Sequence, residues 1–406
     1  MKNILIISNC AASETESNGR IHLLHYKKYL EEEHIFNFYL TGSPDCKKIN
    51  YLSFINRDVL KTKIFKSKNC FPKTFKGGKH VNNVRKKRKH PFLSYFLRNW
   101  IYKNNNAIID SLNNVIEKHK IDVIVLWGCN VPFLYDYALK IALKNNIKVI
   151  TYTGEDYPLK NYNYFTKKPS IFFRSFQKEL FNNCLRLYRS SYCNIYASND
   201  LKAAYEDAFS ISGGVVVYFS SELKHYSGSV KQCRNIVYAG NLYKDRVKSL
   251  VEISNYISKY ESTKIHIYGQ ASNTILKIIN KHENFIYHGC LPYEKLVNEL
   301  ICYDLLLHIE GFSDYYKKDC KFAFSTKIAD YFMLNKPVFM YGPIDISGIK
   351  FAYELNKAYV ATSKDELSKL DNVFNNLKSY AIDLKKIDNF FEASTNCERI
   401  AAIIEK

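Results

Sequence analysis

A lysine and an aspartate stand three residues apart at the start of a predicted helix in the C-terminal half of the chain. Ser325 and Thr326 have the short hydroxyl side chains that cap helix starts, and apolar residues then repeat at helical spacing as far as Leu334. Lys327 and Asp330 therefore share one helix face. A helix start attracts anions, a lysine there strengthens a phosphate site, and a carboxylate one turn later suits ribose hydroxyls. The spacing fits a nucleotide diphosphate, and it also fits a capped helix with a solvated ion pair.

Residues 330–338 read Asp-Tyr-Phe-Met-Leu-Asn-Lys-Pro-Val and lead from this helix into a predicted strand. They resemble the Glu-x-x-x-x-Gly-x-Pro-Val segment of GT-B glycosyltransferases, particularly the retaining family 4. Upstream, residues 236–246, 265–269 and 284–289 resemble the strand and glycine segments of that family's donor domain, in the family's order. The resemblance implies that Asp330 holds the ribose of a donor nucleotide.

The same resemblance places the family's pyrophosphate-binding lysine at Arg246. The family's paired-acid motif would place a second glutamate eight residues before Asp330, where this chain has Phe322. Glu310 begins a Glu-Gly-Phe sequence similar to the family's, but it lies twenty residues before Asp330. Either an insertion over 313–321 separates the two acids, or the first acid is absent.

Composition indicates a globular chain of two domains. The sequence has 406 residues, of which 47% are hydrophobic and 24% are charged. Its 11 cysteines include no Cys-x-x-Cys pair, so neither a zinc site nor a redox motif is predicted. No apolar run approaches the roughly 20 residues of a membrane helix. We expect a cytoplasmic protein.

Positive charge is concentrated in one segment of the N-terminal half. The formal net charge is +20, and residues 51–100 contain 14 basic and 1 acidic side chains. The basic cluster 79–90 adjoins the aromatic and aliphatic stretch 91–100, a combination that suits an anionic membrane surface. This predicts peripheral attachment to the inner face of the membrane through 79–100. A solvated loop before a core helix is the alternative. No nucleic-acid partner is expected, because the sequence has no recognisable helix-turn-helix, RNA-recognition or zinc-finger pattern.

Strands alternate with helices along the chain, which predicts an α/β fold with open parallel sheets. With the resemblance, the expected architecture is two Rossmann-like doubly wound domains that face each other across a cleft. We assign 1–218 to an acceptor-binding domain, 219–387 to a donor-binding domain, and 388–406 to a helix that crosses back to the first domain. The first-half elements expected are strands at 4–8, 35–40, 121–127, 148–152 and 194–197, helices at 21–33, 92–119, 131–145, 169–189 and 201–209, and a poorly patterned segment at 45–90.

Ligands of doubly wound sheets bind beyond the carboxyl ends of the strands. After the first strand, Gly19 would let a ligand approach the backbone and Arg20 would supply charge, although a simple turn explains them as well. Gly128 follows a later strand. Glu155 and Asp156 follow the next one and would orient an acceptor hydroxyl, with an ordinary turn as the alternative.

The resemblance implies transfer of a hexosyl or N-acetylhexosaminyl group from a nucleotide-diphosphate sugar, most simply a UDP-sugar, to a glycan or lipid-diphosphate acceptor. It implies retention at the anomeric carbon, with no bound metal and no further cofactor, in polysaccharide or glycoconjugate synthesis. A sugar-nucleotide 2-epimerase and a basic non-catalytic binding protein remain alternatives. The predicted residues are, for catalysis, Glu155, Asp156, Arg246 and Lys327; for the donor, Gly19, Gly240, Arg246, Gly269, Glu310, Ser325, Thr326, Lys327 and Asp330; and for the acceptor, Arg20, Gly128, Glu155 and Asp156.

Overall fold

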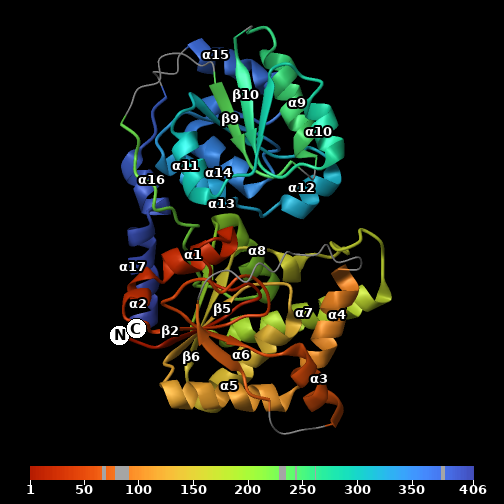
Figure 1. Ribbon diagram of the computed structural model, residues 1–406, viewed down its shortest axis with the longest axis vertical. Coiled ribbons are helices and arrows are strands. Elements are labelled where there is room, and N and C mark those ends of the chain that lie inside the picture. Colours follow the sequence, from red (N-terminus) through yellow and green to blue (C-terminus); the bar gives the residue numbers. More distant parts are fainter. Residues whose placement is uncertain (66–69, 78–90, 228–234, 243–244, 261, 376–379) are drawn as a thin grey trace. The chain divides into compact units, whose positions relative to one another are not determined.

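The computed structural model describes residues 1–65, 70–77, 91–227, 235–242, 245–260, 262–375 and 380–406 (Figure 1). The chain divides into two compact units. Unit 1 contains Met1–Phe219 and Ala393–Lys406, and unit 2 contains Ser220–Glu392. The division after Phe219 lies one residue from the boundary expected from sequence.

Unit 1 is built on an eight-stranded sheet of order β4-β3-β2-β1-β5-β6-β7-β8. Neighbouring strands are parallel except for the β3–β4 pair. The central strands are short apolar runs buried on both faces, as parallel sheets covered by helices require. The strands are β1 (Ile4–Ile7), β2 (Ile35–Phe38), β3 (Asn50–Ser53), β4 (Lys73–Lys76), β5 (Val123–Trp127), β6 (Lys148–Thr153), β7 (Cys193–Tyr196) and β8 (Val215–Val216).

The helices of unit 1 pack on this sheet, with α6 in contact with β5, β6 and the neighbouring helices α5 and α7. They are α1 (Ser17–His25), α2 (Lys27–Glu31), α3 (Asn56–Phe65), α4 (Pro91–Tyr102), α5 (Asn106–His119), α6 (Pro132–Asn145), α7 (Ile171–Ser190), α8 (Asn199–Phe209) and α17 (Ala393–Glu405), with the single turn η1 (Tyr157–Leu159).

Three predictions for unit 1 need correction. The helix expected at 21–33 begins earlier and is interrupted at Tyr26, whose backbone is not helical. The helix expected at 92–119 is two helices, because Asn104 adopts a left-handed conformation that asparagine tolerates. The segment 45–90 was expected to be unpatterned, but it contains β3, α3 and β4, whose short lengths and many lysines conceal their pattern.

Unit 2 is built on a six-stranded parallel sheet of order β11-β10-β9-β12-β13-β14. Two parallel-sheet units confirm the predicted fold class. The strands are β9 (Asn235–Ala239), β10 (Lys264–Tyr268), β11 (Phe285–Gly289), β12 (Leu305–Ile309), β13 (Val338–Tyr341) and β14 (Val360–Ala361). The helices are α9 (Arg246–Ile257), α10 (Asn273–Ile279), α11 (Tyr293–Leu300), α12 (Asp314–Cys320), α13 (Thr326–Met333), α14 (Ser347–Asn356), α15 (Lys369–Asn375) and α16 (Leu384–Phe391), with single turns η2 (Lys357–Tyr359) and η3 (Asp365–Ser368).

The C-terminal segment, expected as one helix over 388–406, contains two. Helix α16 packs on α13 within unit 2, and α17 packs on α1 and α2 within unit 1. Hydrogen bonds from Lys28 to Glu398 and from Tyr29 to Glu405 hold α17 in place. The chain therefore returns to its first unit at Ala393.

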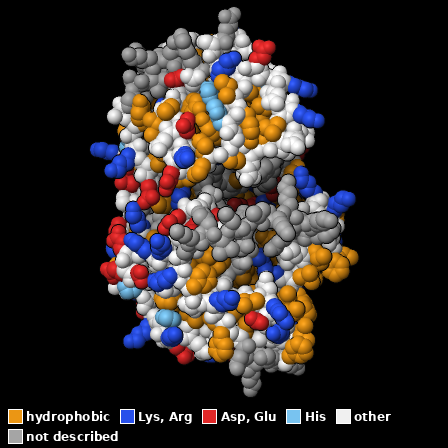
Figure 2. All heavy atoms as spheres, viewed as in Figure 1, with side chains coloured by type: hydrophobic (Ala, Val, Ile, Leu, Met, Phe, Trp, Pro, Cys, Tyr) orange, Lys and Arg blue, Asp and Glu red, His pale blue; other side chains and the backbone are white. Residues whose placement is uncertain are grey.

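The basic cluster 79–90 lies outside the described residues, whereas 91–100 forms most of α4. No helix in the described part of the chain is both long and apolar enough to span a membrane. Three side chains of α4, Leu93, Leu97 and Trp100, are each about half exposed. Figure 2 shows hydrophobic side chains along the margin of unit 1 where Figure 1 places this helix.

Candidate functional site

Glycines end three neighbouring strands of unit 2 and bring their loops close together. Gly240 follows β9, Gly269 follows β10, and Gly289 ends β11. A side chain at Gly269 would place its Cβ 2.0 Å from the carbonyl oxygen of Gly240, so only glycine fits there. The predicted donor residues Gly240 and Gly269 thus contact each other at the carboxyl edge of the sheet, where ligands of such sheets bind.

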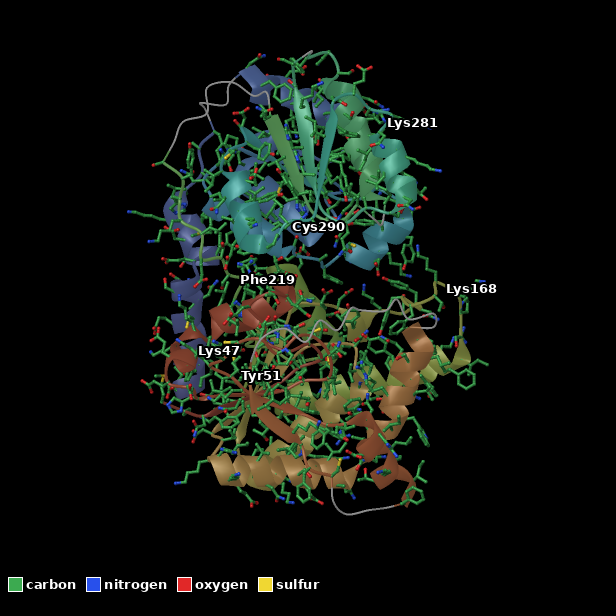
Figure 3. The ribbon with its side chains drawn as sticks, in the orientation of Figure 1. Lys47, Tyr51, Lys168, Phe219, Lys281 and Cys290 are labelled. Atoms are coloured by element: carbon green, nitrogen blue, oxygen red, sulfur yellow. The ribbon has the colours of Figure 1, made fainter. Side chains whose placement is uncertain are left out.

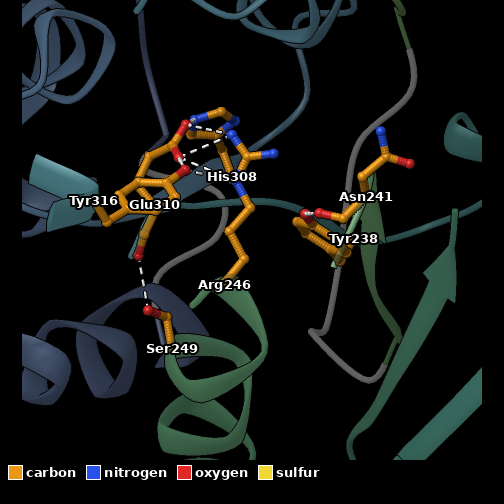
Figure 4. A network of polar contacts seen from close by, with 7 residues as sticks. All are labelled: Tyr238, Asn241, Arg246, Ser249, His308, Glu310 and Tyr316. Atoms are coloured by element: carbon orange, nitrogen blue, oxygen red, sulfur yellow. Dashed lines mark hydrogen bonds and ion pairs between the residues drawn. The ribbon is translucent and has the colours of Figure 1, made fainter. Parts of the chain in front are cut away.

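An ion pair between Arg246 and Glu310 stands beside these loops (Figure 4). Arg246 is the first residue of α9, and Glu310 directly follows β12. The Nε and Nη2 atoms of Arg246 donate to Glu310 Oε2 at 3.0 and 2.9 Å. His308 Nε2 lies 3.0 Å from Glu310 Oε1, and the Tyr316 hydroxyl donates to Oε2. Ser249 Oγ donates to the Glu310 carbonyl at 2.7 Å, which ties α9 to β12.

The Glu310 carboxylate is 3% exposed and its two oxygens already accept hydrogen bonds from three side chains. In the structure this carboxylate holds Arg246, and the direct contact of Glu310 with the donor stays a prediction. Arg246 Nη1 forms no contact within the network drawn in Figure 4 and is the guanidinium atom left to meet a ligand. Residues 313–321, a possible insertion on sequence grounds, form α12, which supplies Tyr316.

Burial and charge shift the pKa values of this network in opposite directions. Burial alone would raise the pKa of the Glu310 carboxyl, but Arg246 and His308 outweigh it and hold that pKa below its ordinary range. Burial lowers the pKa of His308 to about 4, so its ring is neutral at pH 7. Because an ionised Glu310 can only accept, His308 Nε2 carries the proton, and its buried Nδ1 is an acceptor to which no described residue donates a hydrogen bond.

The Lys327 amine is the most unusual group of the site. Lys327 is the second residue of α13, and its Nζ is shielded from solvent yet has no hydrogen-bond partner among the described residues. The amine lies against Gly240, where a Cβ would come within 2.4 Å of Nζ, and 4.9 Å from the centre of the Tyr238 ring. Burial first, and then the charge of Arg246, lower the pKa of Lys327 to about 7. A buried amine without a partner requires an anion to be stable in its charged form.

The start of α13 differs in detail from the prediction. The helix runs over Thr326–Met333 and is followed by β13, as predicted, and Ser325 is its N-cap. The Ser325 side chain, however, forms no capping hydrogen bond. Its hydroxyl does not occupy the helix start, which leaves the positive end of the helix dipole to act on a ligand beside Lys327.

Asp330 lies one turn further along α13 and is 7% exposed. Its Oδ1 accepts hydrogen bonds from Ser221 Oγ at 2.6 Å and from the Tyr293 hydroxyl at 2.9 Å. The carboxylate predicted to hold a ribose is thus fixed by two hydroxyl groups of the chain itself.

The predicted residues of unit 1 are more dispersed. Gly19 lies within α1, and a Cβ there would meet the backbone of Ala11 and Ser13 at 2.6 Å. Close packing of α1 on its own preceding loop therefore requires glycine at position 19, and the predicted contact with a ligand stays a prediction. Arg20 is half-buried on the same helix. The Gly128 N–H donates to the Tyr152 carbonyl at 2.8 Å and links the ends of β5 and β6.

The two acids after β6 differ in their surroundings. Glu155 is exposed, whereas Asp156 is 7% exposed and forms an ion pair of 3.3 Å with Lys160, which is also buried. Glu155 thus remains the accessible carboxylate of this loop. Among the described residues, no His, Cys, Asp or Glu side chains are grouped so as to hold a metal ion.

Sequence reasoning missed His308, Tyr316 and Tyr293 in unit 2. His308 stands two residues before Glu310 in an apolar strand, so both side chains project from the same face, and that spacing was a usable signal. Tyr316 and Tyr293 reach the site from separate helices and carry no comparable signal.

The chain is similar to known proteins in its structure and not in its sequence. No protein-family model matches the sequence, and no curated protein sequence matches it. A sucrose-phosphate synthase from Thermosynechococcus elongatus matches with a TM-score of 0.62 and 7% identity, covering 100% of this chain and 98% of that chain. The lipopolysaccharide outer core galactosyltransferase WaaB in its apo form matches with a TM-score of 0.58 and 13% identity over 99% of both chains.

The chain has the GT-B fold. A third GT-B structure, a putative UDP-N-acetylglucosamine 2-epimerase from Listeria monocytogenes, matches with a TM-score of 0.52 and 11% identity over 100% of this chain and 96% of that chain. Because both transferases and an epimerase share the GT-B fold, the fold leaves the reaction open, and the site residues must decide it.

Proposed function

We propose that this GT-B protein is a glycosyltransferase that moves a sugar from a nucleotide-diphosphate sugar to a hydroxyl of a glycan or lipid-linked acceptor. The observation that carries the proposal is the Lys327 amine, which lies buried between Gly240 and the start of α13 and has no hydrogen-bond partner in the described part of the chain. A diphosphate supplies the charge and the acceptors that this amine lacks.

Sugar transfer requires the diphosphate to leave with its negative charge. Lys327, Arg246 and the start of α13 are fixed before the donor binds, so they stabilise that charge with little rearrangement. His308 and Tyr316 act through Glu310 to keep Arg246 in position. Asp330, oriented by Ser221 and Tyr293, is the group we propose for the ribose, and Glu155 is the exposed acid we propose for the acceptor hydroxyl.

The finer assignments follow from the sequence resemblance. We propose retention at the anomeric carbon, as in family 4, transfer of a hexosyl or N-acetylhexosaminyl group, and independence of a bound metal. UDP is the proposed donor nucleotide. The Listeria neighbour is named as a putative UDP-N-acetylglucosamine 2-epimerase, and a UDP-sugar substrate in that name agrees with this choice. The pathway proposed is synthesis of a surface polysaccharide or glycoconjugate in the cytoplasm.

A membrane-bound acceptor is favoured by α4. Leu93, Leu97 and Trp100 are spaced by four and three residues and lie on one face of the helix, where each is about half exposed. This stripe follows the basic cluster 79–90, and apolar residues beside lysines and arginines suit an anionic lipid surface. We therefore propose peripheral attachment through 79–100.

A product assay tests the proposed reaction. Purified protein is incubated with UDP-glucose, UDP-galactose or UDP-N-acetylglucosamine and a membrane lipid extract, and both free UDP and sugar epimers are measured. Release of UDP with transfer of the labelled sugar to the extract supports the proposal. An epimer formed without net transfer would establish the epimerase alternative instead.

Two lysine variants provide the matched control. Lys327→Met removes the buried amine of the site and should reduce turnover at least tenfold. Lys336→Met removes another lysine of unit 2, 3% exposed, whose amine donates to the Ile301 carbonyl at 2.5 Å away from the site residues. Equal turnover in the two variants would contradict the role proposed for Lys327.

A further inference from the structure

A pocket of 520 Å³ opens in unit 1 between the loop that follows β6 and the first turns of α7. The helix contributes residues three and four apart, which lie on one face. The loop begins two residues after Asp156, at the carboxyl edge of the sheet. Figure 3 shows Lys168 at the outer margin of this region.

The residues that line the pocket are strongly one-sided in charge. They include five cationic side chains, Lys160, Lys167, Lys168, Arg174 and Lys178, and no carboxylate. Walls that carry one sign of charge concentrate ions of the opposite sign, so the pocket selects an anion.

The pocket is held in shape by contacts within unit 1. Gln177 Nε2 donates to the carbonyls of Tyr157 and Pro158 at 2.7 and 3.2 Å, which pins the loop to α7. The Gln177 Oε1 atom is buried, and none of the residues that the structure describes donates a hydrogen bond to it. Lys160, 7% exposed, is positioned by its ion pair with Asp156. The Gln177 Oε1 atom is an acceptor, so a hydroxyl group of a ligand can satisfy it, whereas an anionic group would be met by the cations of the pocket.

Apolar side chains adjoin the basic pocket on one side. Ile171 and Phe172, the first residues of α7, are 81% and 67% exposed. Phe172 contacts Phe96 of α4, with ring centres 5.9 Å apart, so this apolar surface continues onto the exposed stripe of α4. A basic pocket beside exposed apolar residues matches a ligand that has a charged phosphate group and an apolar chain.

We infer that this pocket binds a phosphate or diphosphate ester group of the acceptor. Among its lining residues Lys160 is buried, whereas Lys168, Arg174 and Lys178 are exposed. That the ligand is the acceptor rests on the proposed function, whereas binding of a phosphate ester by the pocket does not. An ester on a lipid would also place its chain against Ile171 and Phe172.

Direct binding to the full chain tests this inference without any assay of sugar transfer. The probes are farnesyl diphosphate, kept below its micelle concentration, and inorganic diphosphate, each titrated by calorimetry. The variant Lys168→Glu/Arg174→Glu/Lys178→Glu should bind both probes at least tenfold more weakly than wild type. The single change Arg174→Glu should weaken binding roughly threefold to tenfold, and it serves if the triple variant does not fold.

The control must separate the pocket from the net charge of +20. Lys47→Glu/Lys48→Glu/Lys118→Glu makes the same charge change at exposed positions of unit 1 outside the pocket, and Figure 3 shows Lys47 well apart from Lys168. Binding lost in the pocket variant and retained in the control supports the inference. If farnesyl diphosphate then binds more tightly than inorganic diphosphate, the ligand is a lipid ester. If the two probes bind equally, the ligand is a soluble ester. Absence of binding, or equal loss in both triple variants, would overturn it.

Discussion

The two units offer anions two different kinds of site. In unit 2, the Lys327 amine is shielded from water, and Arg246, whose side chain is 19% exposed, is held by a carboxylate that is hydrogen-bonded by three side chains. In unit 1, Lys168, Arg174 and Lys178 remain exposed around a pocket. A buried cation is positioned before the ligand arrives but costs stability, whereas an exposed one costs little and is screened by salt. The contrast fits a fixed leaving-group site in unit 2 and a less exacting recognition site in unit 1.

The largest expected effect comes from breaking the buried ion pair of unit 2. Glu310→Ala leaves Arg246 buried without its partner and should lower the free energy of unfolding by about 3–5 kcal/mol. Both tryptophans of the chain, Trp100 and Trp127, lie in unit 1, so their fluorescence follows that unit, while circular dichroism follows both. In a denaturant titration, the change should appear in the dichroism and not in the fluorescence.

The control for that variant is an exposed pair in unit 1. Glu398→Ala removes the partner of Lys28, and the two side chains are 68% and 41% exposed. Its effect should stay below about 1 kcal/mol. If the two variants lose similar stability, the burial of the unit 2 pair is not what distinguishes the units.

Removing Lys327 should stabilise the protein, and more so at low pH. The folded-state pKa is about 7 and the unfolded value 10.5, so the folded state loses a proton that the unfolded state keeps. Wild-type stability therefore falls as pH drops from 10.5 to 7, and the penalty is complete below that range. The stabilisation given by Lys327→Met should be about 2–3 kcal/mol greater at pH 6 than at pH 9. Urea titrations at the two pH values measure it, and a pH-independent difference would show that the amine is solvated.

Loss of the Asp330 carboxylate should act on the donor. Asp330→Ala removes one charged acceptor and should weaken UDP binding by about 10- to 150-fold, equivalent to 1.5–3 kcal/mol. The matched change Tyr293→Phe keeps the carboxylate but removes one of the hydroxyls that orient it, and it should have a smaller effect. Thermal shifts with UDP give both values, and unchanged shifts for Asp330→Ala would exclude it from the ribose site.

The smallest effect is expected at the mouth of the unit 1 pocket. Arg174→Gln replaces an exposed cation and should change the free energy of unfolding by less than about 0.5 kcal/mol. A large loss in a urea titration would show that Arg174 is structural, and the contrast between the two units would then fail.

The sequence predicted those parts of the molecule that depend on local pattern. Apolar runs such as 4–7 and 123–127 indicated the buried strands, and the helix–strand unit around Lys327 was located because its caps, period and proline all lie within twenty residues. The segment with β3, α3 and β4 was missed because their pairing partners, rather than their own apolar pattern, stabilise them.

The sequence predicted many residues of the candidate site but did not predict the contacts that these residues make with one another. Arg246 and Glu310 lie 64 positions apart, so no local spacing could show that they pair. Gly19 was assigned to a ligand because the resembling family has a glycine-containing loop after its first strand, and only the structure shows the loop backbone packed against it. The state of Lys327 could not be inferred either, because it depends on burial against Gly240 and Tyr238, which only the fold brings beside α13.

Calorimetric titration of UDP at pH 8, in two buffers of different ionisation enthalpy, tests the central claim most directly. At this pH the Lys327 amine of the free protein is mostly neutral, because its pKa is about 7. A bound diphosphate favours the charged amine, so UDP binding should take up close to one proton and weaken as pH rises above 7. Lys327→Met should bind UDP about 10- to 150-fold more weakly and without proton uptake, while Lys336→Met should behave as wild type. Binding of UDP by Lys327→Met with wild-type affinity, or no proton uptake by the wild type, would contradict the account.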